Sequence, residues 1–185
     1  MEDIQVYIDL LKSGKTILYP SDTIWALGCD ATNEEACQKI MQLKNRTEGN
    51  SFIILVDGWH MVERYIPEFH EVCYELGDLA EKPLTIVYPN ARNIAPSALA
   101  ADGSIGIRIT NDPICVKLIK GMRKPLISTS ANFSGKPSPQ SFAEVSDKIK
   151  ANVDVIIEER LKEQMTNPSQ IIKVDIDGTF KIIRA

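Results

Sequence analysis

Three polar clusters in this chain carry side chains that could bind a small ligand. The first is Ser21-Asp22-Thr23, which follows a short β-prone run. Hydroxyls and a carboxylate at the carboxyl end of a strand are well placed to orient a small polar molecule. The same residue types also form turns and helix caps. The segment is therefore compatible with a ligand site or with a purely structural turn.

The second cluster is the cationic segment Lys44-Asn45-Arg46. Arginine offers a planar fork of donors and lysine a mobile point charge, and together they suit a polyphosphate. The alternative is a helix that ends in cations because these interact favourably with its dipole. Either interpretation places Lys44 and Arg46 just beyond a helix.

The third cluster is the hydroxyl- and amide-rich segment Ser128-Thr129-Ser130-Ala131-Asn132-Phe133-Ser134-Gly135. Its side chains and backbone N–H groups could contact phosphate oxygens, although a polar loop without a ligand is an equal alternative. The chain has no G-x-x-x-x-G-K-[ST] motif, so it is not a P-loop protein. It also lacks G-x-S-x-G around Ser130, which argues against a hydrolase nucleophile.

Two further cationic features are less specific. Arg108 lies in the otherwise apolar run 105–109, where a cation needs a partner or a cleft; it could bind a carboxylate or face solvent. Lys117, Lys120, Arg123 and Lys124 form a basic run that is typical of a solvated helix face, with an RNA-facing patch as the alternative.

The elements that must position these clusters alternate between helical and extended patterns, which predicts an α/β protein. We expect strands at residues 16–19, 51–56, 84–88, 105–109, 126–129, 153–157, 171–174 and 180–183. We expect helices from residue 4 to about 13, after a capping box at Thr32–Glu35, over 59–80 with a break at Pro67, after an Asp112 cap, and after a second capping box at Ser141–Glu144. Asp177-Gly178 predicts a hairpin, so the sheet should be mixed, with parallel and antiparallel strands.

Composition sets the class of protein. The 185 residues are 44% hydrophobic and 25% charged, which predicts one globular domain over residues 1–185. No apolar run reaches the roughly 18 residues that cross a bilayer, and the acidic N-terminus has no signal-peptide pattern. We therefore expect a cytoplasmic protein without membrane contact. The net charge of −4 argues against indiscriminate nucleic-acid binding.

The four cysteines, Cys29, Cys37, Cys73 and Cys115, form no C-x-x-C pair, and the two histidines lie far from most of them. This spacing argues against a zinc site, so no protein-bound metal is expected. Reduced thiols packed as small apolar groups are the simpler interpretation.

Taken together, the clusters resemble the YrdC/Sua5/YciO family along nearly the whole chain. The resemblance rests on Tyr-Pro-Ser-Asp-Thr-Ile-Trp-Ala-Leu-Gly-Cys-Asp at 19–30, Lys-Asn-Arg at 44–46, Lys-Pro-Leu-Thr at 82–85, Gly-Ile-Arg-Ile at 106–109 and Ser-Thr-Ser-Ala-Asn-Phe-Ser-Gly at 128–135. The K-x-R and S-x-N signatures of the family fall on Lys44, Arg46, Ser130 and Asn132. The resemblance implies a twisted, open, mixed sheet with flanking helices and a large cleft.

The resemblance also implies L-threonylcarbamoyladenylate synthase activity, a nucleotidyltransferase reaction. L-Threonine, bicarbonate and ATP, with Mg²⁺, would give threonylcarbamoyl-AMP and pyrophosphate for the N6-threonylcarbamoylation of adenosine 37 in tRNA. Lys44 and Arg46 would act on the ATP phosphates, and Thr23 and Arg108 would bind threonine. Ser130, Asn132, Ser169 and Arg184 would contact the nucleotide. Downstream transferase proteins would be partners.

The chain departs from the family pattern after K-x-R, where the usual Lys-Pro-Leu is replaced by Thr-Glu-Gly-Asn-Ser-Phe at 47–52. This change removes one cation, adds Glu48 and resembles the YciO branch. Two alternatives therefore remain: a YciO-like paralogue that binds nucleotide without making the adenylate, and a protein that binds tRNA or double-stranded RNA, as family members have been described to do.

Overall fold

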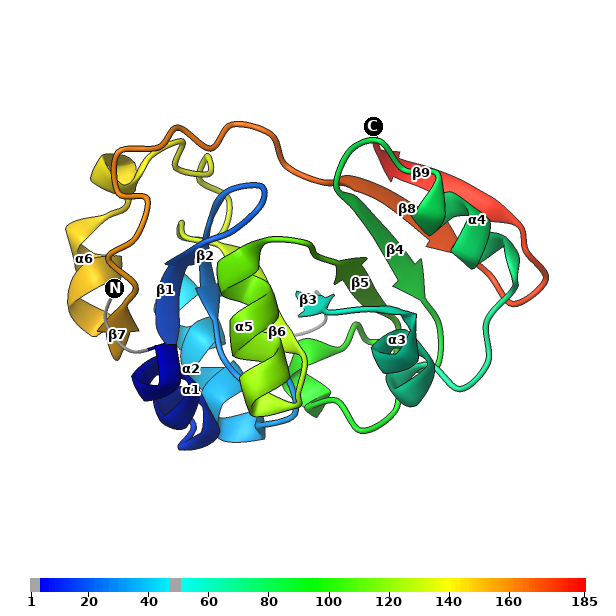
Figure 1. The fold of residues 1–185 in the computed structure, drawn as a ribbon, viewed down its shortest axis with the longest axis horizontal. Coiled ribbons are helices and arrows are strands. Elements are labelled where there is room, and N and C mark those ends of the chain that lie inside the picture. The colour runs from blue at the N-terminus through cyan, green and yellow to red at the C-terminus, as the bar shows by residue number, and fades with distance from the viewer. Residues whose placement is uncertain (1–3, 47–50) are drawn as a thin grey trace.

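The computed structural model describes residues 4–46 and 51–185. Within these residues, nine strands form one twisted sheet in the order β7-β1-β2-β6-β3-β5-β4-β8-β9 (Figure 1). The strands are β1 (Ile17–Pro20), β2 (Trp25–Gly28), β3 (Ile53–Val56), β4 (Leu84–Tyr88), β5 (Ile105–Ile109), β6 (Leu126–Ser130), β7 (Val155–Ile156), β8 (Gln170–Val174) and β9 (Phe180–Arg184). The pairs β1/β7, β3/β5 and β4/β8 are parallel and the others antiparallel, so the predicted mixed sheet is confirmed.

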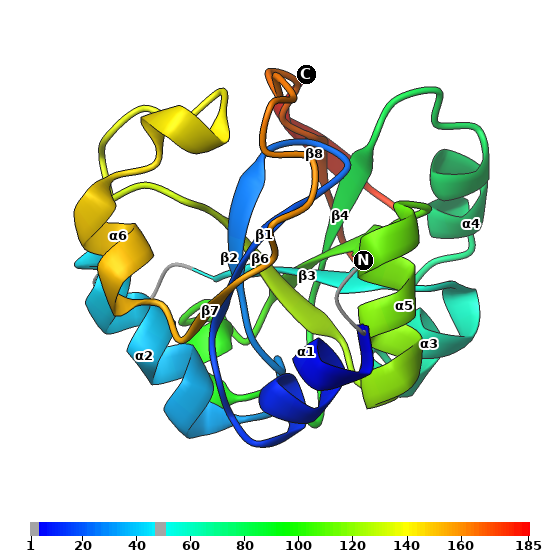
Figure 2. The same ribbon diagram turned by 60° about the vertical axis from the view of Figure 1, so that its left-hand side comes forward.

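Helices flank this sheet on both sides. The helices are α1 (Ile4–Lys12), α2 (Glu34–Lys44), α3 (Trp59–Tyr65), α4 (Val72–Asp78), α5 (Pro113–Met122) and α6 (Asp147–Asn152), with 3-10 turns η1 (Pro96–Ala98) and η2 (Phe142–Glu144). Figure 2 shows α1 and α5 side by side on one face and α2 with α6 on the other. Gly121 permits the close approach of α1 and α5, because a Cβ there would lie 2.2 Å from Ile8 Cδ1.

The predicted helix starts differ from the structure in two places. The cap of α2 is Asn33, whose Oδ1 accepts from the Ala36 N–H at 3.0 Å, so the capping box predicted at Thr32–Glu35 is wrong by one residue. Thr32 instead donates to Asp30. Ser141 precedes the 3-10 turn η2 and Glu144 ends it, whereas α6 begins only at Asp147, so the second predicted capping box does not open a helix. In contrast, Asp112 caps α5 as predicted, accepting from two backbone N–H groups.

Strand β2 was not predicted, and it matters most for the position of the polar clusters. It pairs antiparallel with β1 through a tight connection and with β6 on its other edge. All four of its residues are buried, so it shows no alternation of apolar and polar side chains that a sequence search would detect. Because Ala26 pairs with Ser130, β2 brings the 21–24 turn beside the Ser128–Gly135 segment.

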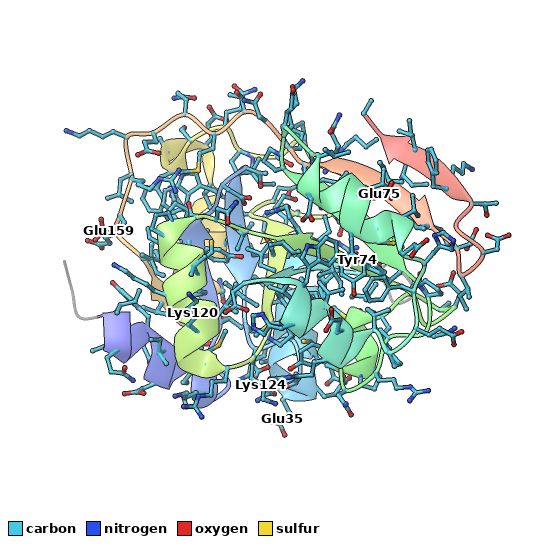
Figure 3. All side chains as sticks on the ribbon, turned by 45° about the vertical axis from the view of Figure 1, so that its right-hand side comes forward. Glu35, Tyr74, Glu75, Lys120, Lys124 and Glu159 are labelled. Atoms are coloured by element: carbon cyan, nitrogen blue, oxygen red, sulfur yellow. The ribbon has the colours of Figure 1, made fainter. Side chains whose placement is uncertain are left out.

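The other surface and core features agree with simple expectations. The four cysteines are free and buried, as predicted. The basic run on and after α5 is exposed, and Lys120 and Lys124 project outward in Figure 3. None of the helices in the described part of the chain is long and apolar enough to span a membrane.

Candidate functional site

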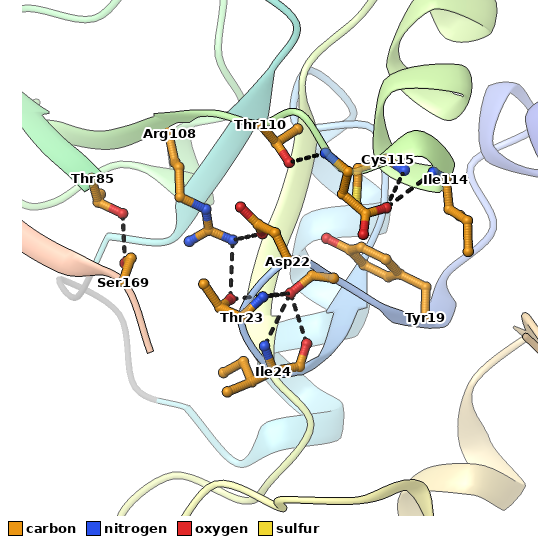
Figure 4. A network of polar contacts seen from close by, with 12 residues as sticks. Tyr19, Asp22, Thr23, Ile24, Thr85, Arg108, Thr110, Ile114, Cys115 and Ser169 are labelled. Atoms are coloured by element: carbon orange, nitrogen blue, oxygen red, sulfur yellow. Dashed lines mark hydrogen bonds and ion pairs between the residues drawn. The ribbon is translucent and has the colours of Figure 1, made fainter. Parts of the chain in front are cut away.

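The turn between β1 and β2 is held by the Ser21 hydroxyl. Its Oγ accepts from the backbone N–H groups of Thr23 at 3.1 Å and Ile24 at 3.2 Å, and it donates to the Ile24 carbonyl at 2.7 Å. Ser21 is fully buried. The structural interpretation of this cluster is therefore correct for Ser21, and the rigid turn sets the positions of Asp22 and Thr23 (Figure 4).

Asp22 and Thr23 both contact Arg108, which comes from the middle of β5. Arg108 Nη2 donates to Asp22 Oδ1 at 2.9 Å and to Thr23 Oγ1 at 3.2 Å. The Arg108 side chain is 3% exposed, and its Nε is buried without a hydrogen-bond partner among the described residues. The structure thus places Thr23 and Arg108, the two residues expected to bind threonine, in direct contact, and it leaves one buried donor of Arg108 without a partner.

A second network joins Thr85, Ser169 and Arg184 from strand β4, the approach to β8, and β9. The hydroxyls of Thr85 and Ser169 lie 2.8 Å apart. Arg184 Nε donates to the Ser169 carbonyl at 2.8 Å, and Nη2 donates to the Ser169 hydroxyl at 3.3 Å. Burial lowers the pKa of Arg184, and the charge of Arg108 lowers it further. The guanidiniums of Arg108 and Arg184 are therefore close enough for their positive charges to repel each other.

Arg46 lies just past the C-terminus of α2 and lines the same cavity as Arg108 and Arg184. Its Nη2 donates to the Ser51 carbonyl at 2.7 Å, and its guanidinium carbon lies 4.8 Å from the centroid of the Phe52 ring. Because Phe52 is buried, its ring holds the Arg46 guanidinium in place through a cation–π contact. Burial lowers the pKa of Arg46. Glu48 lies outside the described residues.

Lys44 connects α2 to the segment after β6. Its Nζ donates to the backbone carbonyls of Ser130 and of Asn132, the latter at 2.7 Å, and its own carbonyl accepts from the Ser134 N–H at 2.9 Å. Lys44 is 2% exposed. Burial lowers its pKa to about 7, and the nearby charge of Arg46 contributes. Lys44 therefore stabilises the backbone of the Ser128–Gly135 segment through these hydrogen bonds.

Asn132 shapes the same segment with its side chain. Its Nδ2 donates to the carbonyls of Phe133 and Lys136. Its Oδ1 is buried and has no hydrogen-bond partner among the described residues. Lys44 and Asn132 thus lie in direct contact, but neither lines the cavity that Arg46 faces.

These networks surround one cavity of about 380 Å³, which we call the arginine cavity. Six of the eight predicted site residues line it: Thr23, Arg46, Arg108, Ser130, Ser169 and Arg184. Its wall holds these three arginines and no carboxylate among the described residues. In a chain with a net charge of −4, such a concentration of cations and hydroxyls is suited to an anionic ligand.

A second cavity of about 650 Å³ lies on the opposite face of β4 and β5, and we call it the acidic cavity. Its apolar wall includes Trp59, Ile86 and Ile107. Its charged lining residues are four carboxylates and one lysine: Asp22, Asp78, Glu81, Asp112 and Lys82. No group of three or more His, Cys, Asp or Glu side chains that could hold a metal ion occurs in the described ranges.

The sequence interpretation did not assign a role to Thr85 or Asp22. Thr85 is fully buried and lines the arginine cavity, and it ends the Lys-Pro-Leu-Thr segment that the resemblance includes. Asp22 stands directly before Thr23 in the first polar cluster. Both residues therefore lay within recognised motifs, but only the fold shows what they touch.

Comparison with known proteins identifies relatives of the whole described chain. The Sua5/YciO/YrdC family model, described as "Telomere recombination", matches residues 9–185. A protein of Haemophilus ducreyi named threonylcarbamoyl-AMP synthase is 30% identical over 184 residues, which cover 98% of this chain and 99% of that protein.

Solved structures give the same result for the fold. The crystal structure of P. abyssi Sua5 complexed with L-threonine has a TM-score of 0.82 and 26% identity, covering 92% of this chain and 50% of that one. This chain thus spans about half of the P. abyssi protein. The crystal structure of E. coli YciO also has a TM-score of 0.82, at 22% identity, covering 98% of this chain and 87% of that one.

Proposed function

The chain belongs to the Sua5/YciO/YrdC family, and from this premise we propose that it is an L-threonylcarbamoyladenylate synthase. It would form threonylcarbamoyl-AMP and pyrophosphate from L-threonine, bicarbonate and ATP, which makes it a nucleotidyltransferase. The observation that carries the proposal is the arginine cavity, where three guanidiniums and several hydroxyls face one space without a carboxylate among the described residues.

The charge of this cavity supports binding of the triphosphate. Guanidiniums bind phosphate oxygens through planar, often bidentate hydrogen bonds, and they stay protonated at any physiological pH. Arg46 comes from the segment after α2 and Arg184 from the edge strand β9, and both line the cavity. Placed there, they would neutralise the charge that builds up as pyrophosphate leaves.

The Thr23–Arg108 pair supports binding of the amino acid. A buried guanidinium with an unused Nε–H needs an acceptor, and the carboxylate of threonine would supply it. The Thr23 hydroxyl lies 3.2 Å from the guanidinium, so it would sit beside the bound carboxylate. Ser130 and Ser169, which line the same cavity, would contact the nucleotide.

The reaction needs no covalent intermediate on the protein. The threonine amine would attack the carbon of bicarbonate, giving a carbamate and releasing water. A carbamate oxygen would then attack the α-phosphorus, and the bond to the bridging oxygen of pyrophosphate would break. The protein would contribute orientation of the two reactants and neutralisation of charge.

Lys44 and Asn132 would contribute by shaping the segment that carries Ser130. Lys44 donates to two backbone carbonyls of this segment, so its removal would loosen the Ser130 hydroxyl as well as remove a positive charge. Mg²⁺ usually keeps several waters and binds through substrate phosphates, so we treat it as part of the ATP substrate.

Pyrophosphate release measures this function directly. Purified protein is incubated with Mg²⁺-ATP alone, and then with threonine, bicarbonate or both. We expect release only when both co-substrates are present, with threonylcarbamoyl-AMP detected by mass spectrometry. Absence of pyrophosphate under every condition would remove the synthase assignment and favour a YciO-like nucleotide-binding paralogue, whose fold this chain shares.

Binding of tRNA or double-stranded RNA is a second candidate function, supported by the exposed basic run on α5. A salt titration tests it, because RNA affinity that depends on phosphate contacts falls steeply as salt concentration rises. Substitution of Lys120 and Lys124 by glutamate should then abolish RNA binding while pyrophosphate release continues.

A further inference from the structure

The turn between β1 and β2 contributes a carboxylate whose position explains how Arg108 is held. Arg108 lines the arginine cavity, whereas Asp22 lines the acidic cavity on the other face of the sheet. Their contact, Asp22 Oδ1 to Arg108 Nη2 at 2.9 Å, joins residues that are 86 positions apart in the chain. The ion pair thus spans the two faces.

We propose that Asp22 is a positioning residue that orients Arg108 to receive the carboxylate of the amino-acid substrate, an inference that rests on the proposed function. Both hydrogen bonds described at Nη2 go to the 21–24 turn, one to Asp22 and one to Thr23. Because a guanidinium is planar, anchoring Nη2 also sets the direction of the Nε–H. That Nε is the buried donor left without a partner among the described residues.

The anchor itself is rigid, which the proposal requires. Ser21 is fully buried, and its hydroxyl accepts hydrogen bonds from the backbone N–H groups of Thr23 and Ile24, the two residues that follow Asp22. The backbone N–H of Ser21 also donates to the Ile24 carbonyl at 3.3 Å. These hydrogen bonds constrain the backbone of the turn, so the Asp22 carboxylate approaches Arg108 from a held position.

A positioning role and a purely electrostatic role predict opposite signs. If Asp22 only offsets the charge of Arg108, removing its carboxylate should make the cavity more positive and strengthen binding of an anionic ligand. If Asp22 orients Arg108, removing it should weaken threonine binding, because the guanidinium would have to be ordered when the ligand binds. The direction of the change in threonine affinity therefore decides between them.

The experiment compares Asp22→Ala and Asp22→Asn with the wild-type protein. We expect the KM for threonine to rise about tenfold or more in Asp22→Ala, and less in Asp22→Asn, whose amide oxygen can still accept from Nη2. The affinity for ATP, measured by calorimetry without threonine, should stay within about twofold. An unchanged or lowered threonine KM in both variants would overturn the proposal.

Two controls exclude a general structural effect. Asp112→Asn alters another buried carboxylate that pairs with an arginine, Arg160 at 2.6 Å, and should lower thermal stability without changing the threonine KM. In the Arg108→Ala background, Asp22→Asn should cause no further loss of threonine binding, because Asp22 acts through Arg108. A further loss of threonine binding in this double variant would contradict the proposal that Asp22 acts through Arg108.

The test also separates this inference from the proposed function. A wild-type protein that releases pyrophosphate with threonine, combined with Asp22 variants that keep the wild-type threonine KM, would overturn the inference alone. A wild-type protein that neither releases pyrophosphate nor binds threonine in calorimetry would overturn the function, and the inference with it. If Asp22→Ala fails to fold, Asp22→Asn decides the outcome.

Discussion

The arginine cavity and the acidic cavity lie on opposite faces of β4 and β5 and carry opposite charge. Residues that alternate along the same strands point to different sides: Thr85 and Arg108 face the arginine cavity, and Ile86 and Ile107 face the acidic cavity. The acidic cavity is larger, about 650 Å³ against about 380 Å³. The larger volume therefore does not identify the site. An anionic substrate is attracted to the smaller cavity because three arginines and no carboxylate among the described residues line its wall.

The same comparison shows how each face is stabilised. On the acidic side, carboxylates are satisfied within the protein: Asp78 accepts from the Trp59 indole N–H at 2.9 Å, and Asp112 caps α5 and pairs with Arg160. On the arginine side, the Nε of Arg108 stays buried without a partner among the described residues. An unsatisfied buried donor costs stability, so such a donor on a residue that lines a cavity is typical of a site that a ligand completes.

The largest expected effect is on Arg46 and Lys44. Arg46→Ala and Lys44→Ala should each lower turnover at least about tenfold in the pyrophosphate assay. Arg46→Ala removes a cation that lines the arginine cavity, and Lys44→Ala removes the donor that holds the segment carrying Ser130. Lys82→Ala, which removes the lysine of the acidic cavity, is the matched control and should leave turnover within about twofold. Equal losses in all three variants would break the distinction between the cavities.

A smaller effect is expected for Asn132→Ala. Loss of the Nδ2 donors should loosen the segment after β6 and weaken ATP binding about fivefold, the equivalent of roughly one hydrogen bond. The variant should remain folded, because Asn132 is only half-buried at the surface of the segment. Isothermal calorimetry measures the affinity, and wild-type ATP binding would count against a role in nucleotide recognition.

Ser169→Ala should have a milder effect than Asn132→Ala. The hydroxyl links Thr85 to Arg184, whereas the Ser169 carbonyl continues to accept from Arg184 Nε in the variant. We expect the KM for ATP to rise about threefold, because only one of two contacts to the arginine is lost. Ser97→Ala removes a hydroxyl that contacts Glu34 away from both cavities, and it should not alter the KM.

The smallest effect is a proton taken up when ATP binds. Since the pKa of Lys44 is lowered to about 7, its Nζ is mostly neutral at pH 8 in the free protein and charged below pH 6. Bound phosphates favour the charged form and raise this pKa, so binding at pH 8 should take up a fraction of a proton, while at pH 6 Lys44 should add nothing. Calorimetry in two buffers of different ionisation enthalpy measures the uptake.

Lys44→Met serves as the control for this measurement, because it keeps a long side chain without a titratable group. The variant should lose the uptake at pH 8. Persistence of the same uptake in Lys44→Met would assign the proton to another group and leave the low pKa of Lys44 without a link to nucleotide binding.

Local signals were enough to predict most elements of the fold. Asp112 followed by Pro113 predicted the start of α5, and Asp177-Gly178 predicted the β8–β9 hairpin, because both patterns act through backbone geometry within a few residues. The caps of α2 and α6 were misplaced because Thr32 donates to Asp30 instead and because the residues after Ser141 form the short 3-10 turn η2. Strand β2 was missed because uniform burial leaves no periodic pattern.

Sequence alone determined which residue types were available for chemistry: the hydroxyls of the first and third clusters, the Lys44–Arg46 pair, and an arginine inside an apolar strand that had to find a partner. Only the tertiary structure decided which of them share a space. The pairing of β2 with β6 and of β8 with β4 brings Thr23, Ser130 and Ser169 around Arg108. The same folding turns the Lys44 ammonium toward backbone carbonyls and away from the cavity, because the direction of a side chain depends on the element that carries it and on what packs against it.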